Sequence, residues 1–173
     1  MRQRQSIPSL WLLSDARNDP ALERALARLP RGSGFIFRHY HLPPDERLRR
    51  FRALARRARA RGIAVVLAGD PALAMRWGAD GSYGVPMRCA GFRLATAHDL
   101  RELGKARRCG ADAVLLSPVL PTRSHPGGAS LGPARFRRLA MQAAIPVIAL
   151  GGMNARRARA LRWPRWAAID GLS

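Results

Sequence analysis

The chain has 173 residues, of which 47% are hydrophobic, so it is long enough to fold around its own core, and we expect one domain, residues 1–173. Cys89 and Cys109 have no CxxC spacing and no clustered histidines, which argues against a zinc site or a redox pair and fits a reducing cytoplasm. The apolar run before Ser14 is too short for a signal peptide or a membrane span, so we expect a cytoplasmic protein without a membrane partner.

The formal net charge of +20 comes almost wholly from arginine, and Lys105 is the single lysine. Such a charge is typical of nucleic-acid-binding proteins. The arginines between residues 47 and 61, however, alternate with alanine in a helical pattern, which favours a solvated helix face and argues against a nucleic-acid partner. The same positive field attracts phosphorylated small molecules, which we expect as partners. Nothing in the sequence excludes a homo-oligomer.

Short apolar runs alternate with helical patterns along the whole chain. Strands are predicted at residues 10–14, 35–37, 63–68, 82–83, 92–95, 113–116, 147–150 and 166–169. A first helix is predicted to begin with Asp19 as its N-cap, and Asn154 is predicted to cap the last one, at residues 155–161. The other helices are predicted at residues 43–61, 71–75, 97–109 and 133–143.

Strict alternation of strands and helices predicts parallel strands joined by right-handed crossovers. The eight predicted strands favour a compact (β/α)8 TIM barrel over the alternative, a doubly wound open sheet. No helix is predicted after residues 166–169, so we expect the last helix of the barrel to be missing.

Glycines follow the seventh predicted strand, at a position where parallel barrels often bind phosphate. Gly151 and Gly152 come directly after residues 147–150, and Ser173 follows the eighth strand. Because glycine lets an anion approach the backbone N–H groups, these three residues are candidates for phosphate binding. The alternative is that the two glycines only turn the chain into the next helix.

The long loop after residues 113–116 carries Thr122, Ser124 and His125. Loops of this length in a compact chain are usually functional. His125 has the chemistry of a general acid or a phosphate ligand, and an exposed loop histidine is an equally good interpretation. Arg38 ends the second strand, where its guanidinium would point into the mouth of the barrel and bind phosphate bidentately.

Other polar residues also follow strand ends. For His98, after residues 92–95, a structural role such as capping is favoured over binding. Asp70, after residues 63–68, is a lone carboxylate and only a weak candidate for a metal ligand. His39 and His41, beside Arg38, are interpreted as surface residues.

The segments GADAVLLSPVLPTRSH and IPVIALGGMN resemble the thiamine phosphate synthase superfamily, which also contains thiazole tautomerases. The resemblance implies a TIM barrel and a transferase that joins hydroxymethylpyrimidine pyrophosphate to thiazole phosphate with Mg²⁺. Pyrophosphate would leave in a dissociative, carbocation-like substitution. The resemblance also implies that Thr122 and Ser124 lie near the thiazole phosphate, and that Gly151 and Gly152 form a glycine phosphate site.

Two further motifs of the superfamily are matched only in part. Thr96 and His98 stand where a Ser-x-His pair follows the fifth strand. Arg38 matches the arginine of a Gln-x-Arg-x-Lys motif that meets the pyrophosphate, but Ile36 replaces its glutamine and Tyr40 its lysine.

The aspartates that hold Mg²⁺ in the superfamily are not matched. The motif after the third strand reads Ala68-Gly69-Asp70, so only a shifted Asp70 could replace its aspartate, and the second metal aspartate aligns near Arg88. His125 stands in place of the loop lysine. Because a pyrophosphate needs a metal or several cations, arginines such as Arg38, Arg88 and Arg123 are candidates to replace the metal.

The sequence therefore predicts a thiamine-phosphate-synthase-like enzyme of thiamine biosynthesis. In it Arg38 contacts the phosphates of the second substrate, and His125 contacts pyrophosphate or transfers a proton. One alternative is a thiazole phosphate tautomerase-like isomerase, whose loop histidine aligns with Pro118 and leaves His125 as the nearest replacement. The other is a catalytically degenerate barrel that only binds a phosphorylated ligand or a nucleic acid.

Overall fold

The computed structural model describes residues 6–84, 91–123 and 127–172. Its strands are β1 (Leu10–Leu13), β2 (Gly34–Phe37), β3 (Ala64–Gly69), β4 (Gly81–Gly84), β5 (Phe92–Ala97), β6 (Ala113–Leu116), β7 (Val147–Ala149) and β8 (Trp166–Ala168). Its α-helices are α1 (Leu22–Arg28), α2 (Pro44–Ala60), α3 (Pro71–Arg76), α4 (Leu100–Arg108), α5 (Gly132–Gln142) and α6 (Ala155–Leu161). Two short 3₁₀-helices are η1 (Asp19–Ala21) and η2 (Asp170–Leu172).

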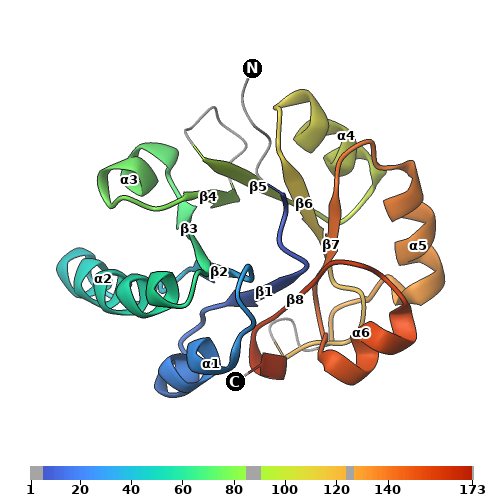
Figure 1. Ribbon diagram of the computed structural model, residues 1–173. Coiled ribbons are helices and arrows are strands. Elements are labelled where there is room, and N and C mark those ends of the chain that lie inside the picture. Colours follow the sequence, from blue (N-terminus) through green and yellow to red (C-terminus); the bar gives the residue numbers. More distant parts are fainter. Residues whose placement is uncertain (1–5, 85–90, 124–126, 173) are drawn as a thin grey trace.

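The eight strands are parallel and close into a barrel in the order of the chain (Figure 1). β1 pairs with β2 on one side and with β8 on the other, where Leu10 lies opposite Trp166. The closed ring confirms the predicted TIM barrel and rules out the doubly wound open sheet. After β8 the described chain continues as η2.

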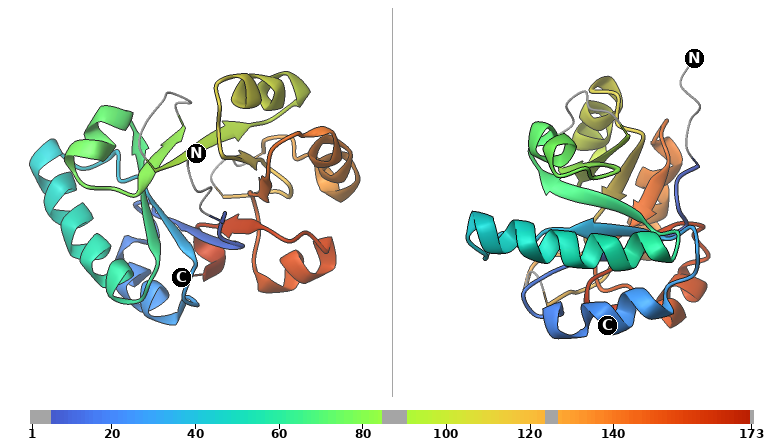
Figure 2. Two further views of the ribbon diagram at one scale, coloured as in Figure 1. Left: turned by 45° about the horizontal axis from the view of Figure 1, so that its top comes forward. Right: turned by 60° about the vertical axis from the view of Figure 1, so that its left-hand side comes forward.

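The helices form an outer layer around the barrel (Figure 2). α1, α2 and α3 share one apolar cluster with β1, β2 and β3, whereas α4, α5 and α6 share another with β5 to β8. A third cluster fills the barrel interior. Alternate residues of a strand point to opposite sides of the barrel wall. In β1, Trp11 and Leu13 point into the barrel interior, and Leu12 packs against the surrounding helices. Burial on both faces explains why the strands read as unbroken apolar runs.

Trp11 is the largest side chain of the interior and is fully buried. Its ring meets Phe92 edge to face, with ring centroids 6.0 Å apart. A Cβ atom on Gly34, in the neighbouring strand β2, would overlap the indole ring. The interior therefore requires glycine at position 34, because no other residue leaves room for this tryptophan.

Two predicted helix starts are wrong. The helix predicted to begin at residue 97 begins at Leu100, because β5 continues to the buried Ala97 and Asp99 caps the helix by accepting from the Glu102 N–H. Asp19 does not cap the first helix either: Asn18 precedes η1, and the Asp19 carboxylate bonds to His39 and Arg50 instead. The cap at Asn154 is confirmed, since its side chain accepts from the Arg157 N–H at 2.9 Å.

Among the described residues, no helix combines the length and the apolar character needed to cross a membrane.

Candidate functional site

A cavity of about 750 Å³ opens at the carboxyl ends of the strands. Residues from the ends of nearly every strand line it, as expected for the functional face of a parallel barrel. We call it the mouth cavity, and its boundary is marked by Arg38, Thr96, Ser117, Thr122, Gly152 and Asp170.

The structure brings together many of the residues predicted for the site. Those lining the mouth cavity are Arg38, Thr96, His98, Thr122, Arg123, Gly151 and Gly152. Asp70 is not among the lining residues, because its carboxylate caps α3 and accepts from the Ala72 N–H at 2.9 Å. The predictions for Arg88, Ser124, His125 and Ser173 fall outside the described residues.

The loop after β7 exposes backbone amides to the mouth cavity. Gly151 and Gly152 have φ angles of 99° and 64°, which glycine adopts far more readily than other residues. A Cβ on Gly151 would lie 2.6 Å from Cα of Pro118, and one on Gly152 would lie 2.5 Å from the Pro121 carbonyl oxygen. Within the described part of the chain, neither glycine N–H has a protein acceptor. This loop therefore offers two backbone donors to an anion.

The loop after β6 packs directly on this glycine loop. The Val119 N–H donates to the Leu150 carbonyl at 2.8 Å, and the Leu120 N–H donates to the Gly151 carbonyl at 3.1 Å. Thr122 follows within two residues and lines the mouth cavity. The two segments predicted to form one phosphate site are thus held side by side.

Thr96 and His98 lie at the end of β5. The Nδ1 atom of His98 is 2.7 Å from the Ser117 carbonyl, which can only accept, so Nδ1 carries a proton and donates it. The hydroxyl of Tyr83, from β4, hydrogen-bonds with Thr96, and burial raises the pKa of Tyr83 against the opposing effects of Thr96 and Arg38. This side of the mouth cavity presents an imidazole and two hydroxyl groups.

Charged groups gather between the ends of β1, β2 and β8. The Arg17 guanidinium lies 3.2 Å from a carboxylate oxygen of Asp15 and 3.7 Å from one of Asp170. Arg38 lies 4.0 Å from the other oxygen of Asp15. The sequence interpretation missed Asp15, Arg17 and Asp170, although Asp15 and Asp170 directly follow predicted strands, which was a usable signal.

A buried hydrogen-bond network supports the backbone of Arg38. The Arg38 N–H donates to Ser14 Oγ at 2.8 Å, and the Ser14 hydroxyl in turn donates to His39 Nδ1 at 2.8 Å. His39 Nε2 then donates to the Asp19 carboxylate at 2.7 Å. Ser14 and His39 are almost fully buried. We call Ser14, His39 and Asp19 the polar relay.

The polar relay corrects the interpretation of His39 as a surface residue. Its φ of 34° turns the side chain under the strand ends, where the ring stacks on Phe37 with centroids 4.5 Å apart. Burial lowers the pKa of His39 and outweighs the opposing effect of Asp19, so the ring is neutral. Burial alone would raise the pKa of Asp19, but hydrogen bonds from His39 and Arg50 lower it below its ordinary value.

Arg47 holds Arg38 from the other side. Its Nε donates to the Arg38 carbonyl at 3.1 Å, and its terminal nitrogen donates to the Ala68 carbonyl at 2.9 Å. The guanidinium carbon lies 5.1 Å from the ring centroid of Tyr40 and 5.4 Å from that of Trp77. Both backbone polar groups of Arg38 are therefore fixed, which limits where its side chain can reach.

Asn18 joins the loops after β1 and β8. Its side-chain amide donates to the carbonyls of Leu13 and Ile169, both at 3.0 Å, and its Oδ1 accepts from the Asp15 N–H at 2.8 Å. The buried Asn18 therefore sets the position of Asp15 beside Arg17.

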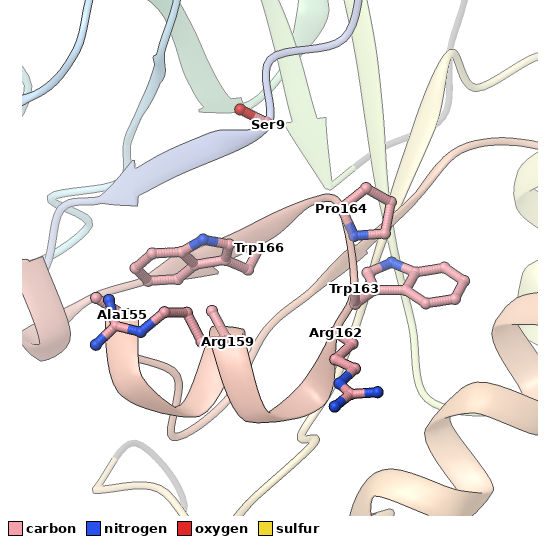
Figure 3. A pocket seen from close by; sticks show the side chains of 8 residues that line it. Ser9, Ala155, Arg159, Arg162, Trp163, Pro164 and Trp166 are labelled. Carbon is pink, nitrogen blue, oxygen red and sulfur yellow. The ribbon is translucent and has the colours of Figure 1, made fainter.

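A second, shallower cavity of about 520 Å³ lies against α6, near the amino end of β1 (Figure 3). Trp166, Arg159 and Ser9 are among its lining residues, and Figure 3 shows Trp166 above the helix that carries Arg159. Trp163 also lines it, but its indole N–H donates to the Val147 carbonyl at 2.9 Å. None of the residues predicted for the site lies here.

Comparison with known proteins gives the same family as the motifs. The family model for thiamine monophosphate synthase matches residues 94–170. The thiamine biosynthesis bifunctional protein ThiM/ThiE of Symbiobacterium thermophilum is 31% identical over 163 residues, which cover 87% of this chain and 34% of that protein. The thiamine-phosphate synthase of Geobacillus thermodenitrificans is 36% identical over 80 residues, or 45% of this chain and 35% of that protein.

Solved structures support the same fold. Thiamine phosphate pyrophosphorylase from Pyrococcus furiosus superposes with a TM-score of 0.78 at 21% identity, covering 97% of this chain and 88% of that one. The corresponding protein of Bacteroides thetaiotaomicron gives a TM-score of 0.60 at 18% identity, over 93% of this chain and 82% of that one. At these identities the likeness establishes the barrel fold.

The chain spans about a third of the length of the curated relatives that it matches. The family match nevertheless covers the segment from β5 to β8, which supplies the glycine loop, Thr96, His98 and Thr122 to the mouth cavity. Over this segment the chain is therefore similar to the thiamine monophosphate synthases.

Proposed function

We propose that this chain is a transferase of the thiamine phosphate synthase type. It joins hydroxymethylpyrimidine pyrophosphate to thiazole phosphate in thiamine biosynthesis. The observation that carries the proposal is the lining of the mouth cavity, which combines the backbone donors of Gly151 and Gly152 with four arginine side chains. The second half of the barrel, which supplies the glycines, also matches the family model. A cavity with this lining suits two phosphorylated substrates.

The phosphate of the thiazole would bind at the glycine loop. Gly151 and Gly152 donate from the backbone, and Thr122 supplies a hydroxyl from the neighbouring loop. Arg157 lies at the same edge, because its guanidinium donates to the Gly152 carbonyl at 2.6 Å. Ser124 and Ser173 are further candidates for this phosphate on the sequence alone.

The diphosphate of the pyrimidine would bind across the cavity at Arg38. In the reaction the thiazole nitrogen forms a bond to the methylene carbon of the pyrimidine, and the bond from that carbon to the pyrophosphate oxygen breaks. The electron pair leaves with pyrophosphate, so positive charge develops on carbon and negative charge on the leaving group. Arg38 would stabilise that negative charge, and His125 would contact pyrophosphate or transfer a proton. Thr96 and His98 would contact the substrates from the β5 side.

Outside the gaps at residues 85–90 and 124–126 and the two chain ends, the structure shows no set of side chains that matches the Mg²⁺ ligands of the family. Among the described residues there is no group of three or more His, Cys, Asp or Glu side chains that could hold a metal. Asp70, the sequence candidate, caps α3. The proposed reaction is therefore assigned to the side chains of the mouth cavity.

The proposal is tested by incubating the protein with both substrates and measuring thiamine phosphate after oxidation to its fluorescent product. Formation above background supports it, and none above background with either Mg²⁺ or EDTA refutes it. A parallel sample with the thiazole alone separates a transferase from an isomerase, because only the isomerase converts that substrate by itself.

Two variants examine the glycine loop. Gly152→Ala would place a Cβ 2.5 Å from the Pro121 carbonyl oxygen and distort the donors, so we expect thiamine phosphate formation to fall about tenfold or more. Gly78→Ala is the matched control, since Gly78 also has a positive φ, 69°, but its Cβ would meet nothing within 4 Å. Thr122→Val keeps the backbone unchanged and should raise KM for the thiazole phosphate. Wild-type KM and rate in both site variants would contradict the assignment.

A further inference from the structure

We infer that the mouth cavity binds a diphosphate group with arginine side chains in the role that a divalent cation plays in the family. The inference rests on the proposed function, since it concerns the second substrate of that reaction. Its basis is the position of every Asp and Glu side chain and of four guanidinium groups.

The chain has eleven Asp and Glu residues, and none of them falls in the segments outside the described residues. The structure therefore places every Asp and Glu side chain. Nine of these side chains do not line the mouth cavity, and the structure shows a structural role for several of them. Asp70 and Asp99 cap helices, Asp112 pairs with Arg93, and Asp80 accepts from the Val65 N–H.

The two carboxylates that do line the mouth cavity share a cation already. Asp15 and Asp170 both lie within 4 Å of the Arg17 guanidinium, at 3.2 and 3.7 Å, and Arg38 approaches Asp15 at 4.0 Å. Protein-bound Mg²⁺ usually needs one or two carboxylates together with the substrate phosphates. A second cation beside Arg17 would be repelled, so the local charge disfavours a metal ion at Asp15 and Asp170, the Asp and Glu side chains that line the described cavity.

Four arginines line the same cavity: Arg17, Arg38, Arg123 and Arg157. Arg17, Arg38 and Arg123 come from the loops after β1, β2 and β6, and Arg157 comes from α6, which follows β7. In the closed barrel these positions lie on the two sides of β8, so the arginines belong to two separate pairs of neighbouring strands. With two carboxylates opposite four guanidinium groups, the cavity carries a net positive charge. Each guanidinium has a planar set of donors that matches two phosphate oxygens and stays charged at any physiological pH. These properties suit a diphosphate without a metal ion.

The first test is calorimetric titration of the whole chain with inorganic pyrophosphate, once in EDTA and once with Mg²⁺. We expect saturable binding in EDTA, with a Kd that Mg²⁺ improves by less than about threefold. Binding only with Mg²⁺ overturns the inference and leaves the proposed function standing. Absence of binding in both conditions also overturns it, and a separate titration with thiazole phosphate then shows whether the proposed function fails with it.

Substitution of Asp15 should change the affinity for pyrophosphate in opposite directions, depending on whether arginines or a metal ion bind the diphosphate. If arginines bind the diphosphate, Asp15→Asn removes a carboxylate that competes for Arg17 and Arg38, and pyrophosphate binding in EDTA becomes about threefold tighter or more. If Asp15 holds a metal, the same variant weakens binding in Mg²⁺. A Kd that rises in Asp15→Asn therefore contradicts the inference, as does an unchanged one.

Arginine variants identify the binding groups. Arg38→Gln should weaken pyrophosphate binding in EDTA about tenfold, because it removes a charge-assisted donor. Arg52→Gln removes the same charge from the exposed face of α2, outside the mouth cavity, and should change Kd by less than about twofold. Equal effects of the two variants would reduce the binding to general attraction by a basic protein and overturn the inference.

Discussion

The hydroxyl group of Ser14 is the centre of the polar relay, and we expect the free energy of unfolding to depend on it. Ser14→Ala leaves the Arg38 N–H without its acceptor and His39 Nδ1 without its donor. Ser14 is fully buried and His39 is 1% exposed, so water cannot replace the lost partner without rearrangement. Leaving a buried polar group unsatisfied costs about 1–3 kcal/mol. We therefore expect a loss of about 2 kcal/mol in the free energy of unfolding, which for a chain of this size lowers Tm by about 4–8 °C.

Chemical denaturation and thermal unfolding measure this loss directly. Ser33→Ala is the matched control, because Ser33 is also buried but no partner of its hydroxyl is found among the described residues. It should change stability by less than about 0.5 kcal/mol. The variant Ser14→Ala should also raise KM for the pyrimidine diphosphate, since Arg38 loses one of its two backbone supports. If the two serine variants were equally stable, the reasoning about the polar relay would be refuted.

Two further predictions concern the same end of the barrel. The pKa of His39 is lowered in the folded protein, so the unfolded chain binds more protons than the folded one as the pH falls below about 6.5, and the free energy of unfolding should decline there. The decline should be smaller in His39→Asn, a variant chosen because asparagine tolerates the φ of 34°. Urea titrations between pH 7.5 and 5 check this, and parallel declines in the two proteins would refute it. Asn18→Ala removes the donors to the Leu13 and Ile169 carbonyls and should cost about 1–3 kcal/mol in urea unfolding, a loss that a wild-type midpoint would exclude.

The barrel was predictable because its signals are local. Each strand is a short apolar run and each helix has its own pattern, so eight alternating units could be counted from the sequence alone. The glycine loop was equally visible, because Gly151 and Gly152 stand directly after an apolar run. What local patterns could not give was the exact start of helices such as α4, where the buried Ala97 continues the strand.

The polar relay was not predictable in the same way. Ser14 and His39 are 25 residues apart, and their hydrogen bond exists only because β1 and β2 end side by side. A histidine next to Arg38 and His41 in a polar stretch reads as a surface residue, and only its left-handed backbone conformation turns it inward. Asp19 was misread for a related reason: a local rule assigned it to a helix cap, whereas a distant histidine and arginine compete for its carboxylate.

The arginine excess has a structural reason at the amino end of α2. Arg52 and Arg56 are exposed, as expected for a solvated face, but Arg47 and Arg50 turn toward the mouth of the barrel. Arg47 spans the carbonyls that end β2 and β3 and stacks on two aromatic rings, and Arg50 bonds with Asp19 at 2.8 Å. A lysine could satisfy one such carbonyl, but it has neither the fork that reaches two nor the flat face that stacks. Arginine side chains thus hold the strand ends from outside the barrel, at Arg47 and Arg50, and line the mouth cavity, at Arg38. At Arg47 the preference for arginine over lysine follows from the geometry of the guanidinium as well as from its charge.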